Sequence, residues 1–369
     1  MKKTLLISSL MLLLLGCNQK TKENTMQTLF VGTYTDGESE GIYRLNFDST
    51  TGELSNQELA ATITNPSFLA ISENGQNVYA VQETADFDSL GGGVSAFNLN
   101  EGMLELQNSL GTHGAHPCHV SLSHDGQLAV SNYTGGNLAI FKLKTDGSLQ
   151  ANPQLIDHKV LGTTEASHVH KAEFTESGLL VADLGLDAIK RYESKNGQWQ
   201  PAGQQSLNLP QGAGPRHFVE GQNGRYLYVI NELNATITVF EQNEKGNYDG
   251  IQTQSSLPID FKGESFCADI HLSADGKFLY GSNRGHNSLV IFKVDKSSGK
   301  IELIGHESVR GDWPRNFTID ATGNYILVAN QRSNNITVFK RDIEKGTLSY
   351  LNEFKIPSPV CLVFTNEND

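Results

Sequence analysis

The sequence predicts an all-β fold: a seven-bladed β-propeller with four antiparallel strands in each blade. Three observations predict it: a repeated segment, glycine turns at fixed places within each copy, and incomplete copies at the two ends of the chain. The period is about 45 to 51 residues, within the range of propeller blades. Aligned at one position, the copies start at Pro66, Pro117, His168, Pro215, Phe266, Pro314 and Pro359.

Each copy begins with a strand of alternating apolar residues, followed by a turn and a second apolar strand. Residues 214–233, GPRHFVEGQNGRYLYVINEL, show the pattern, with Asn223 and Gly224 in the turn. Asn-Gly is a strong hairpin signal because both residues tolerate a positive φ. A third strand is expected at residues 136–143, 187–192, 235–240, 287–294 and 334–339. A second glycine turn then leads into the fourth strand, at residues 145–149, 195–199, 244–248, 297–301 and 344–348.

The copy that starts at Pro359 contains a single strand. The strands that it lacks are found near the start of the chain, at residues 28–35, 41–47 and 51–54. We expect these segments to pair with the C-terminal strand and complete the seventh blade. Such closure removes the exposed sheet edges that would otherwise promote aggregation. The sequence therefore predicts one propeller domain over residues 28–369, with no long helix.

The first 17 residues have the pattern of an exported lipoprotein. Two lysines precede an apolar run from Leu5 to Leu15, which is too short to cross a membrane comfortably. The ending Leu-Leu-Gly-Cys resembles the lipobox of bacterial lipoproteins, in which the cysteine, here Cys17, is lipidated and becomes the first mature residue. Residues 18–27 are polar and are expected to form a tether. An ordinary signal peptide that contains a cysteine is the alternative.

From this pattern we expect an exported protein, anchored by lipid to the cell envelope on its periplasmic or outer side. The formal net charge of −13 argues against a nucleic-acid partner and against a basic membrane-binding patch, so membrane contact is expected only through the anchor. An anionic ligand would have to meet a local cluster of arginines. The sequence carries no signal for an oligomeric state.

Beyond Cys17 the chain has three cysteines, Cys118, Cys267 and Cys361. An odd number with wide spacing is not typical of a disulfide framework. We expect these residues to be small buried hydrophobic side chains, although one pair could form a disulfide.

Unusual polar residues recur at two places in the repeat. In a propeller, the loops around one end of the central axis collect side chains from every blade. The histidines and arginines at the starts of the first strands are His119, His168, His170, Arg216, His217 and Arg315. The polar residues at the ends of the second strands are Glu83, Asn132, Asp183, Asn231, Glu232, Asn283, Arg284 and Asn330.

The Asn and Asp residues have a structural explanation, because their side chains can bond backbone groups of the following turn. This interpretation is expected to apply to Asn132 and Asn330. Glu232 and Arg284 differ, since each follows the Asn of its own copy by one position and the two copies are neighbours. The resulting hypothesis is a site shared by three adjacent blades and formed by His168, His170, Arg216, His217, Glu232 and Arg284.

These residue types suit ester or lactone hydrolysis without a covalent intermediate. A carboxylate or a neutral imidazole can take a proton from water near pH 7. Arginine supplies fixed positive charge where the oxyanion develops. A guanidinium also binds a carboxylate or phosphate through two parallel hydrogen bonds.

Parts of the pattern also fit metal binding, and a serine nucleophile is a further alternative. His113, His116 and His119 are regularly spaced and, with His170 and His217, could bind a metal ion. However, His113 and His116 fall in an expected loop, and no zinc-binding spacing is matched. No Gly-x-Ser-x-Gly motif for a serine nucleophile occurs. We therefore expect no metal ion and no other cofactor.

Three stretches, SHVHKAEFTESGLLVADLGLDAIKRY, GPRHFVEGQNGRYLYVINEL and GSNRGHNSLVIF, carry a resemblance to a known family. They are similar to the lactonase family of seven-bladed propellers, which includes bacterial 6-phosphogluconolactonases and fungal carboxy-muconate lactonising enzymes. The resemblance covers the chain after the tether and rests on the motifs His-Val-His, Gly-Pro-Arg-His, Asn-Glu-Leu and Asn-Arg-Gly-His. It implies hydrolysis of a small-molecule lactone.

The functional set of this family is one His, two Arg and one Glu. The resemblance implies that the catalytic residues are His168 or His170, Arg216, Glu232 and Arg284. It also implies an ion pair between Arg216 and Glu232, with Glu232 or a His as the base and the two arginines holding the anionic substrate and the oxyanion. Further substrate contacts are expected from His119, His217 and Arg315.

One feature departs from the best-known activity of the family, which is on a cytoplasmic phosphosugar lactone. Phosphorylated sugars are scarce outside the cytoplasm, whereas this chain has the pattern of an exported protein. We therefore expect hydrolysis of a sugar-acid lactone, with a non-phosphorylated sugar lactone or a uronic acid lactone as the physiological substrate. The alternatives are a non-catalytic binding protein for an anionic sugar or a partner, and a lactonising isomerase that acts on muconates.

Overall fold

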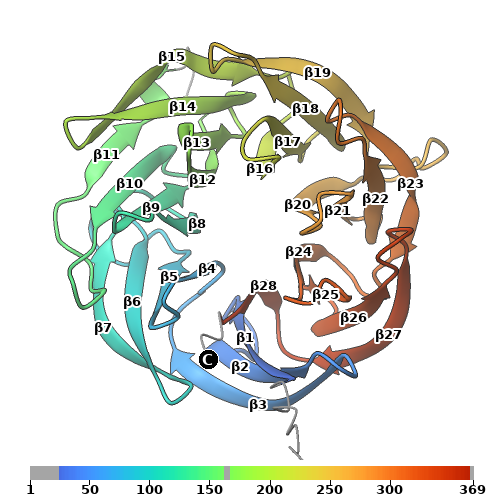
Figure 1. Ribbon diagram of the computed structural model, residues 1–369. Helices are drawn as coiled ribbons and strands as arrows, with labels where there is room; N and C mark the ends of the chain where they lie inside the picture. The colour runs from blue at the N-terminus through green and yellow to red at the C-terminus, as the bar shows by residue number, and fades with distance from the viewer. Residues whose placement is uncertain (1–24, 162–166, 366–369) are drawn as a thin grey trace, which may run out of the picture.

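The computed structural model describes residues 25–161 and 167–365; the expected signal peptide, with Cys17, lies outside them. The described residues form seven sheets of four antiparallel strands, arranged as blades in a ring (Figure 1). The predicted all-β seven-bladed propeller is confirmed. Within the described residues the only helix is the three-residue 3-10 helix η1 (Lys159–Leu161). None of their helical segments is long and apolar enough to cross a membrane.

In each blade the first strand lies next to the central axis and the fourth lies outermost (Figure 1). Blade 1 comprises β4 (Leu69–Ile71), β5 (Asn77–Gln82), β6 (Gly93–Asn100) and β7 (Met103–Gly111). Blade 2 comprises β8 (Pro117–Leu122), β9 (Gln127–Asn132), β10 (Asn137–Lys142) and β11 (Gln154–Asp157). Blade 3 comprises β12 (Val169–Thr175), β13 (Gly178–Asp183), β14 (Ala188–Lys195) and β15 (Gln198–Asn208).

The remaining blades follow the same order. Blade 4 comprises β16 (Pro215–Gly221), β17 (Tyr226–Asn231), β18 (Thr236–Gln242) and β19 (Tyr248–Ser255). Blade 5 comprises β20 (Phe266–Leu272), β21 (Phe278–Arg284), β22 (Ser288–Val294) and β23 (Ile301–Ser308). Blade 6 comprises β24 (Pro314–Ile319), β25 (Tyr325–Asn330), β26 (Asn335–Arg341) and β27 (Leu348–Lys355). Blade 7 comprises β28 (Pro359–Phe364), β1 (Met26–Thr33), β2 (Gly41–Asp48) and β3 (Glu53–Thr62).

Blade 7 closes the ring as the sequence predicts, because β28 pairs with β1 in an antiparallel register. The β1 strand begins at Met26, two residues before the expected start of the domain. Leu29 and Val31 of β1 pack with Leu362 of β28 and with Leu327 of blade 6, and all four side chains are buried. Burying side chains of this size contributes roughly 1.5–3 kcal/mol each. Segments far apart in the sequence are thus held in a single sheet.

The turns explain why the hairpins form. Asn223 and Gly224, between β16 and β17, have φ values of 55° and 80°, a region that Asn and Gly tolerate well. One expected strand lies elsewhere. The turn at Gly147 is followed only by an isolated bridge between Leu143 and Leu149, and the outer strand β11 starts after Pro153. Proline has no N–H for the ladder, which explains why pairing is delayed beyond it.

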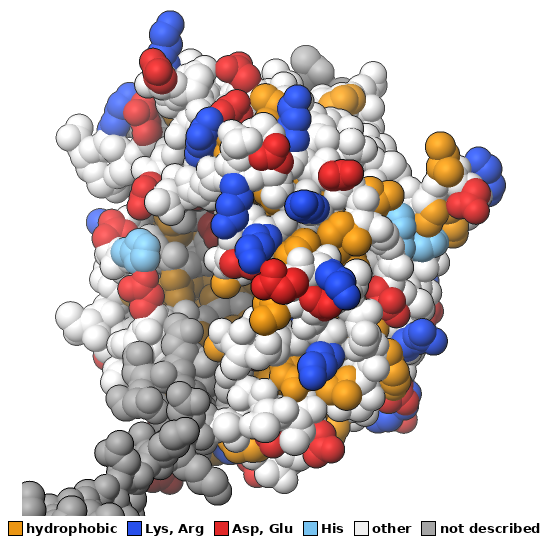
Figure 2. Space-filling model, turned by 45° about the vertical axis from the view of Figure 1, so that its right-hand side comes forward, with side chains coloured by type: hydrophobic (Ala, Val, Ile, Leu, Met, Phe, Trp, Pro, Cys, Tyr) orange, Lys and Arg blue, Asp and Glu red, His pale blue; other side chains and the backbone are white. Residues whose placement is uncertain are grey.

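Packing between blades fixes the inner strands relative to one another. Between blades 4 and 5, Tyr228 and Ile230 of β17 pack with Cys267 and Ile270 of β20, and all four side chains are buried. The outer wall is different in character. Figure 2 shows acidic and basic side chains interspersed on it, with small hydrophobic patches between them. The blades are therefore held in place by the packing of buried side chains between them.

Candidate active site

The face of the ring at which the innermost strands begin, here called the strand-start face, carries most of the predicted site residues. The first residue after the second strand takes an equivalent place in several blades. The backbone N–H of Glu232 donates to the carbonyl of Gly214 at 2.7 Å, and that of Glu83 donates to Asn65 at 3.0 Å. Side chains from different blades are thereby brought to one level around the axis.

Glu232 joins two arginines. Its Oε2 lies 3.0 Å from Nε of Arg216 and 2.8 Å from Nη2 of Arg284. The side chains of Arg216 and Arg284 are 3% and 6% exposed, whereas that of Glu232 is 16% exposed. The expected pairing of Arg216 with Glu232 is present, and Arg284 from the next blade completes the cluster.

Backbone carbonyls of β20 hold both guanidinium groups. Arg216 donates through Nη1 to the carbonyl of Ala268, and Arg284 donates through Nε to Phe266 at 3.2 Å and through Nη2 to Cys267 at 3.0 Å. Burial lowers the pKa of Arg284 to about 10, while Glu232 acts in the opposite direction. Both arginines therefore stay charged near pH 7. Two cations and one anion leave a local excess of positive charge in a protein that is acidic overall.

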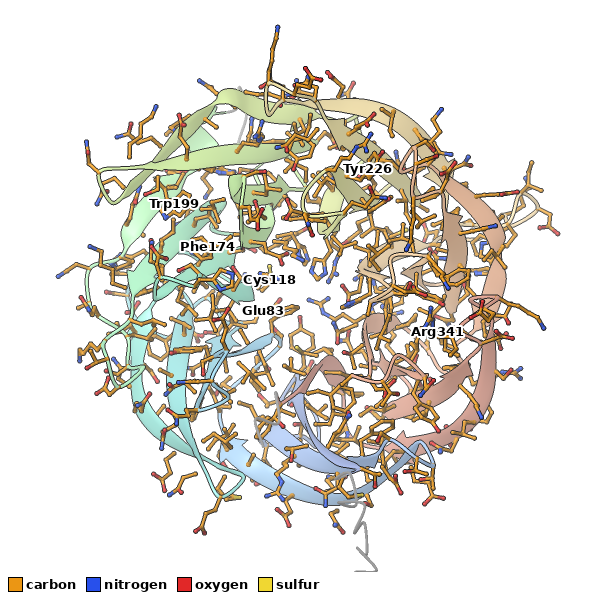
Figure 3. The ribbon with its side chains drawn as sticks, in the orientation of Figure 1. Glu83, Cys118, Phe174, Trp199, Tyr226 and Arg341 are labelled. Atoms are coloured by element: carbon orange, nitrogen blue, oxygen red, sulfur yellow. The ribbon has the colours of Figure 1, made fainter. Side chains whose placement is uncertain are left out.

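A second ion pair, formed with residues of blades 6, 7 and 1, is within electrostatic range of the first. Arg315 lies 3.7 Å from Oε2 of Glu83, which also accepts hydrogen bonds from Tyr34 at 2.7 Å and from Ser67. Figure 3 shows Glu83 and Cys118 at the inner wall of the ring. Glu83 was not predicted as a site residue, although it has the same place after its second strand as Glu232. This equivalent place in the repeat is the sequence signal that could have identified Glu83.

The His-Val-His motif places its two histidines at different depths. His168 is half-buried, and its ring is stacked on Tyr133 with centroids 4.6 Å apart and planes 18° apart. Its Nδ1 lies 3.2 Å from the carbonyl oxygen of Tyr133, which can only accept, so Nδ1 is the donor; in the neutral ring the lone pair is then on Nε2. His170 is buried, and the centroid of its ring lies 5.2 Å from that of the His217 ring.

His119, His170 and His217 form a buried group in which the ring of His217 contacts the other two. Burial lowers the pKa of all three imidazoles, that of His217 to about 3, so they are neutral near pH 7. His217 donates through Nδ1 to Asp269 at 2.8 Å, and its Nε2 lies 3.5 Å from Nη1 of Arg216. The structure thus brings His217 into contact with Arg216, and the His217 side chain is buried.

The residues at the ends of the second strands have mixed roles. Asp183 accepts hydrogen bonds from the backbone of Gly185 and Leu186 in the following turn, as the sequence predicts. The same prediction is wrong for Asn132 and Asn330. Asn132 donates to the carbonyl of Thr112, and Asn330 donates to Thr337 on the third strand. Both side chains are fully buried, and neither bonds a backbone group of the following turn among the described residues.

The cysteines and the histidine-rich loop are structural in character. Cys118, Cys267 and Cys361 are buried and free, which confirms the prediction of small buried side chains; the possible disulfide is absent. The Nδ1 of His116, in the loop before β8, lies 2.9 Å from the hydroxyl oxygen of Thr134, in the loop after β9. Across residues 25–161 and 167–365, no three His, Cys, Asp or Glu side chains are arranged so that they could hold a metal ion.

An exposed arginine lies beside the cluster. The guanidinium of Arg332 is 3.4 Å from the centroid of the Trp313 ring, and that of Arg284 is 5.3 Å from the same ring. In the described part of the chain, Arg332 has no carboxylate partner. A groove of about 630 Å³ lies between blades 7 and 1, but Arg216, Glu232 and Arg284 do not line it. The candidate site is therefore identified by its cluster of charged side chains and not by this groove.

Comparisons with known proteins agree with the fold. Residues 28–364 match the family described as Lactonase, 7-bladed beta-propeller. The chain is 36% identical to a 6-phosphogluconolactonase of Bacillus subtilis over 92% of this chain and 98% of that one. It is 38% identical to a 6-phosphogluconolactonase of Formosa agariphila over 79% and 86% of the two chains. A solved structure, the periplasmic gluconolactonase of Pseudomonas aeruginosa, superposes with a TM-score of 0.86 at 32% identity, covering 92% of this chain and 99% of that one.

Proposed function

The chain belongs to the lactonase family of seven-bladed β-propellers and is an enzyme of that class, and from this premise we propose that it hydrolyses a sugar-acid lactone at the strand-start face. The observation that carries the proposal is the cluster in which Glu232 holds Arg216 and Arg284 in place. Guanidinium groups fixed before the reaction can stabilise an oxyanion without reorganising.

In the proposed reaction, water adds to the carbonyl carbon of the lactone. His168 is the base, because its Nε2 has a free lone pair and its ring is held against Tyr133 at a half-buried position. The buried histidines are less suited, since the low pKa of His170 and His217 opposes their taking a proton. The ring C–O bond then breaks and releases a hydroxy acid.

Arg216 and Arg284 stabilise the oxyanion, and Glu232 keeps both guanidinium groups oriented. Its Oε2 is shared between the two arginines, whereas its Oε1 has no hydrogen-bond partner among the described residues. Glu232 is therefore the alternative base, through Oε1. Substitution of His168 and Glu232 separately distinguishes these roles.

The positive charge at the site favours an anionic substrate. Arg332 is exposed and stacked on Trp313, next to Arg284, so it can bind a carboxylate or phosphate remote from the reacting ester. We propose that the physiological substrate is a non-phosphorylated sugar lactone or a uronic acid lactone. The lipoprotein pattern at residues 1–17 supports this choice, as does a relative named a periplasmic gluconolactonase. Export and lipid anchoring at Cys17 are parts of the same proposal.

The test ranks lactones by kcat/KM for the purified full-length protein. The panel contains gluconolactone, a uronic acid lactone and 6-phosphogluconolactone, each corrected for spontaneous hydrolysis. A higher value for a non-phosphorylated lactone is expected. A clear preference for 6-phosphogluconolactone would contradict the proposed substrate but not the reaction, and no turnover of any lactone would contradict the reaction itself.

A further inference from the structure

Tyr133 lies at the same level of the ring as Glu232. It is the first residue after β9, and its backbone N–H donates to the carbonyl of His116 at 2.9 Å. Glu232 has the equivalent bond to Gly214 after β17. The repeat of the backbone pattern therefore brings the Tyr133 side chain to the strand-start face.

The ring of Tyr133 is fixed by the two histidines of the His-Val-His motif. It stacks on His168 and meets the edge of His170, with centroids 5.7 Å apart. Its own carbonyl accepts the hydrogen bond from Nδ1 of His168. Tyr133 is thus held rigidly against the proposed base by both its backbone and its side chain.

The hydroxyl of Tyr133 has no hydrogen-bond partner in the described part of the chain, and the residue is half-buried. Burial and the charge of Glu232 raise its pKa, whereas Arg216 and Arg284 act in the opposite direction. The phenol is therefore protonated near pH 7, and two guanidinium groups are within electrostatic range to stabilise a transient phenolate. A fixed, protonated and unbonded donor at a site is suited to serve as an acid.

Lactone hydrolysis needs such a donor. When the tetrahedral intermediate collapses, the ring C–O bond breaks and its electron pair goes to the ring oxygen, which is strongly basic as an alkoxide. We propose that Tyr133 is a catalytic residue that donates its phenolic proton to this ring oxygen. The resulting phenolate is reprotonated by the proton that His168 took from water, so the net change is the addition of one water to the lactone. This inference rests on the proposed lactone hydrolysis and adds an acid to it.

The test uses Tyr133→Phe in the full-length protein, because this change removes the hydroxyl and keeps the stacked ring. Two kinds of lactone are compared: the sugar lactone that the wild type hydrolyses fastest, and dihydrocoumarin, an aromatic lactone. Dihydrocoumarin releases a phenol, whose pKa of about 10 makes it a good leaving group without an acid. The matched control is Tyr350→Phe, on the exposed outer strand β27.

For the sugar lactone, kcat of Tyr133→Phe is expected to fall by roughly 10²–10⁴-fold, the usual contribution of a positioned acid, with KM changed less than about threefold. For dihydrocoumarin the loss should be less than about tenfold. Equal losses on both lactones, or a loss of less than about tenfold on the sugar lactone, would overturn the assignment. If the wild type does not hydrolyse dihydrocoumarin, the sugar lactone alone decides. The assignment of Tyr133 as the acid is then overturned if the loss of kcat/KM in Tyr133→Phe comes from a higher KM rather than from a lower kcat. A wild type that hydrolyses no lactone instead overturns the proposed function.

Discussion

The carboxylate of Glu232, at the end of β17, lies 3.0 Å from the guanidinium of Arg216, at the start of β16. The pair joins the two ends of one hairpin at the strand-start face. Because Arg284 of the next blade shares the same oxygen, the contact also fixes blade 4 relative to blade 5 at the site.

Replacing Glu232 with Gln should abolish most of the activity but leave binding of an acidic product measurable. A neutral amide leaves Arg216 and Arg284 without a counter-charge and cannot hold both in place, so kcat should fall by about 100-fold or more. The measurement is kcat for the best lactone, with product binding followed by calorimetry. The control, Glu241→Gln, removes a carboxylate from an exposed ion pair in the same blade. Unchanged kcat in Glu232→Gln would remove this residue from the mechanism.

The two histidines of the His-Val-His motif should differ in effect. His168→Gln removes the proposed base and is expected to lower kcat by roughly 10²–10⁴-fold. His170→Gln changes a buried neutral ring and should lower kcat by less than about tenfold while reducing the melting temperature. Steady-state kinetics and thermal unfolding of both variants test this. The opposite order of the two kcat losses would assign the base to His170.

Acid should destabilise the fold through the buried histidines. The pKa of His119 is well below 6.5 in the folded protein because burial opposes its charge, and Lys171 acts in the same direction. The unfolded state therefore binds more protons below pH 6.5, and the free energy of unfolding falls as pH falls from 6.5 to 5. In His119→Phe the free energy of unfolding should depend less steeply on pH between 6.5 and 5. The difference in slope from the wild type should be at most about 1.4 kcal/mol per pH unit. Denaturant unfolding at several pH values measures it; an unchanged slope would contradict the account.

Arg332 should affect specificity more than chemistry. Arg332→Gln removes an exposed guanidinium that is stacked on Trp313, so KM for a lactone with a carboxylate or phosphate group should rise by about tenfold. KM for gluconolactone, which is uncharged, should stay the same. Arg310→Gln, which changes an exposed arginine paired with Glu307, is the control. Equal changes for charged and uncharged lactones would show that Arg332 does not contact the anionic group.

The repeat made most of the fold predictable, because each strand pair ends in a glycine turn and the same pattern recurs in every copy. Blade 2 is the exception. The turn at Gly147 predicts a strand directly after it, but the outer strand β11 begins only after Pro153, which has no backbone N–H to donate. The closing of blade 7 was predictable because the incomplete copies at the two ends complement each other.

The site was only partly predictable. Arg216, Glu232 and Arg284 stand out in the sequence because charged residues are rare at strand ends of a buried sheet. Glu83 stands among the polar residues at the ends of the second strands, but its copy lacks the preceding Asn that marks Glu232, so the sequence does not assign it to the site. Tyr133 gave no signal, since a tyrosine after an apolar strand is usual in a core, and only its stacking on His168 distinguishes it. Equivalent places in the repeat indicate which blades meet at the site, but they do not indicate which side-chain atoms touch.

The most direct test of the central claim follows acid release from gluconolactone and the other lactones by the wild type and by Arg216→Ala. Arg216 is buried between Glu232 and the carbonyl of Ala268, so its loss removes fixed positive charge from the reaction centre. Arg225→Ala, which changes an exposed arginine of the same blade, is the control. The account predicts catalysed release by the wild type and the control, and a loss of at least about 100-fold in Arg216→Ala. Release at the spontaneous rate by the wild type, or undiminished release by Arg216→Ala, would contradict it.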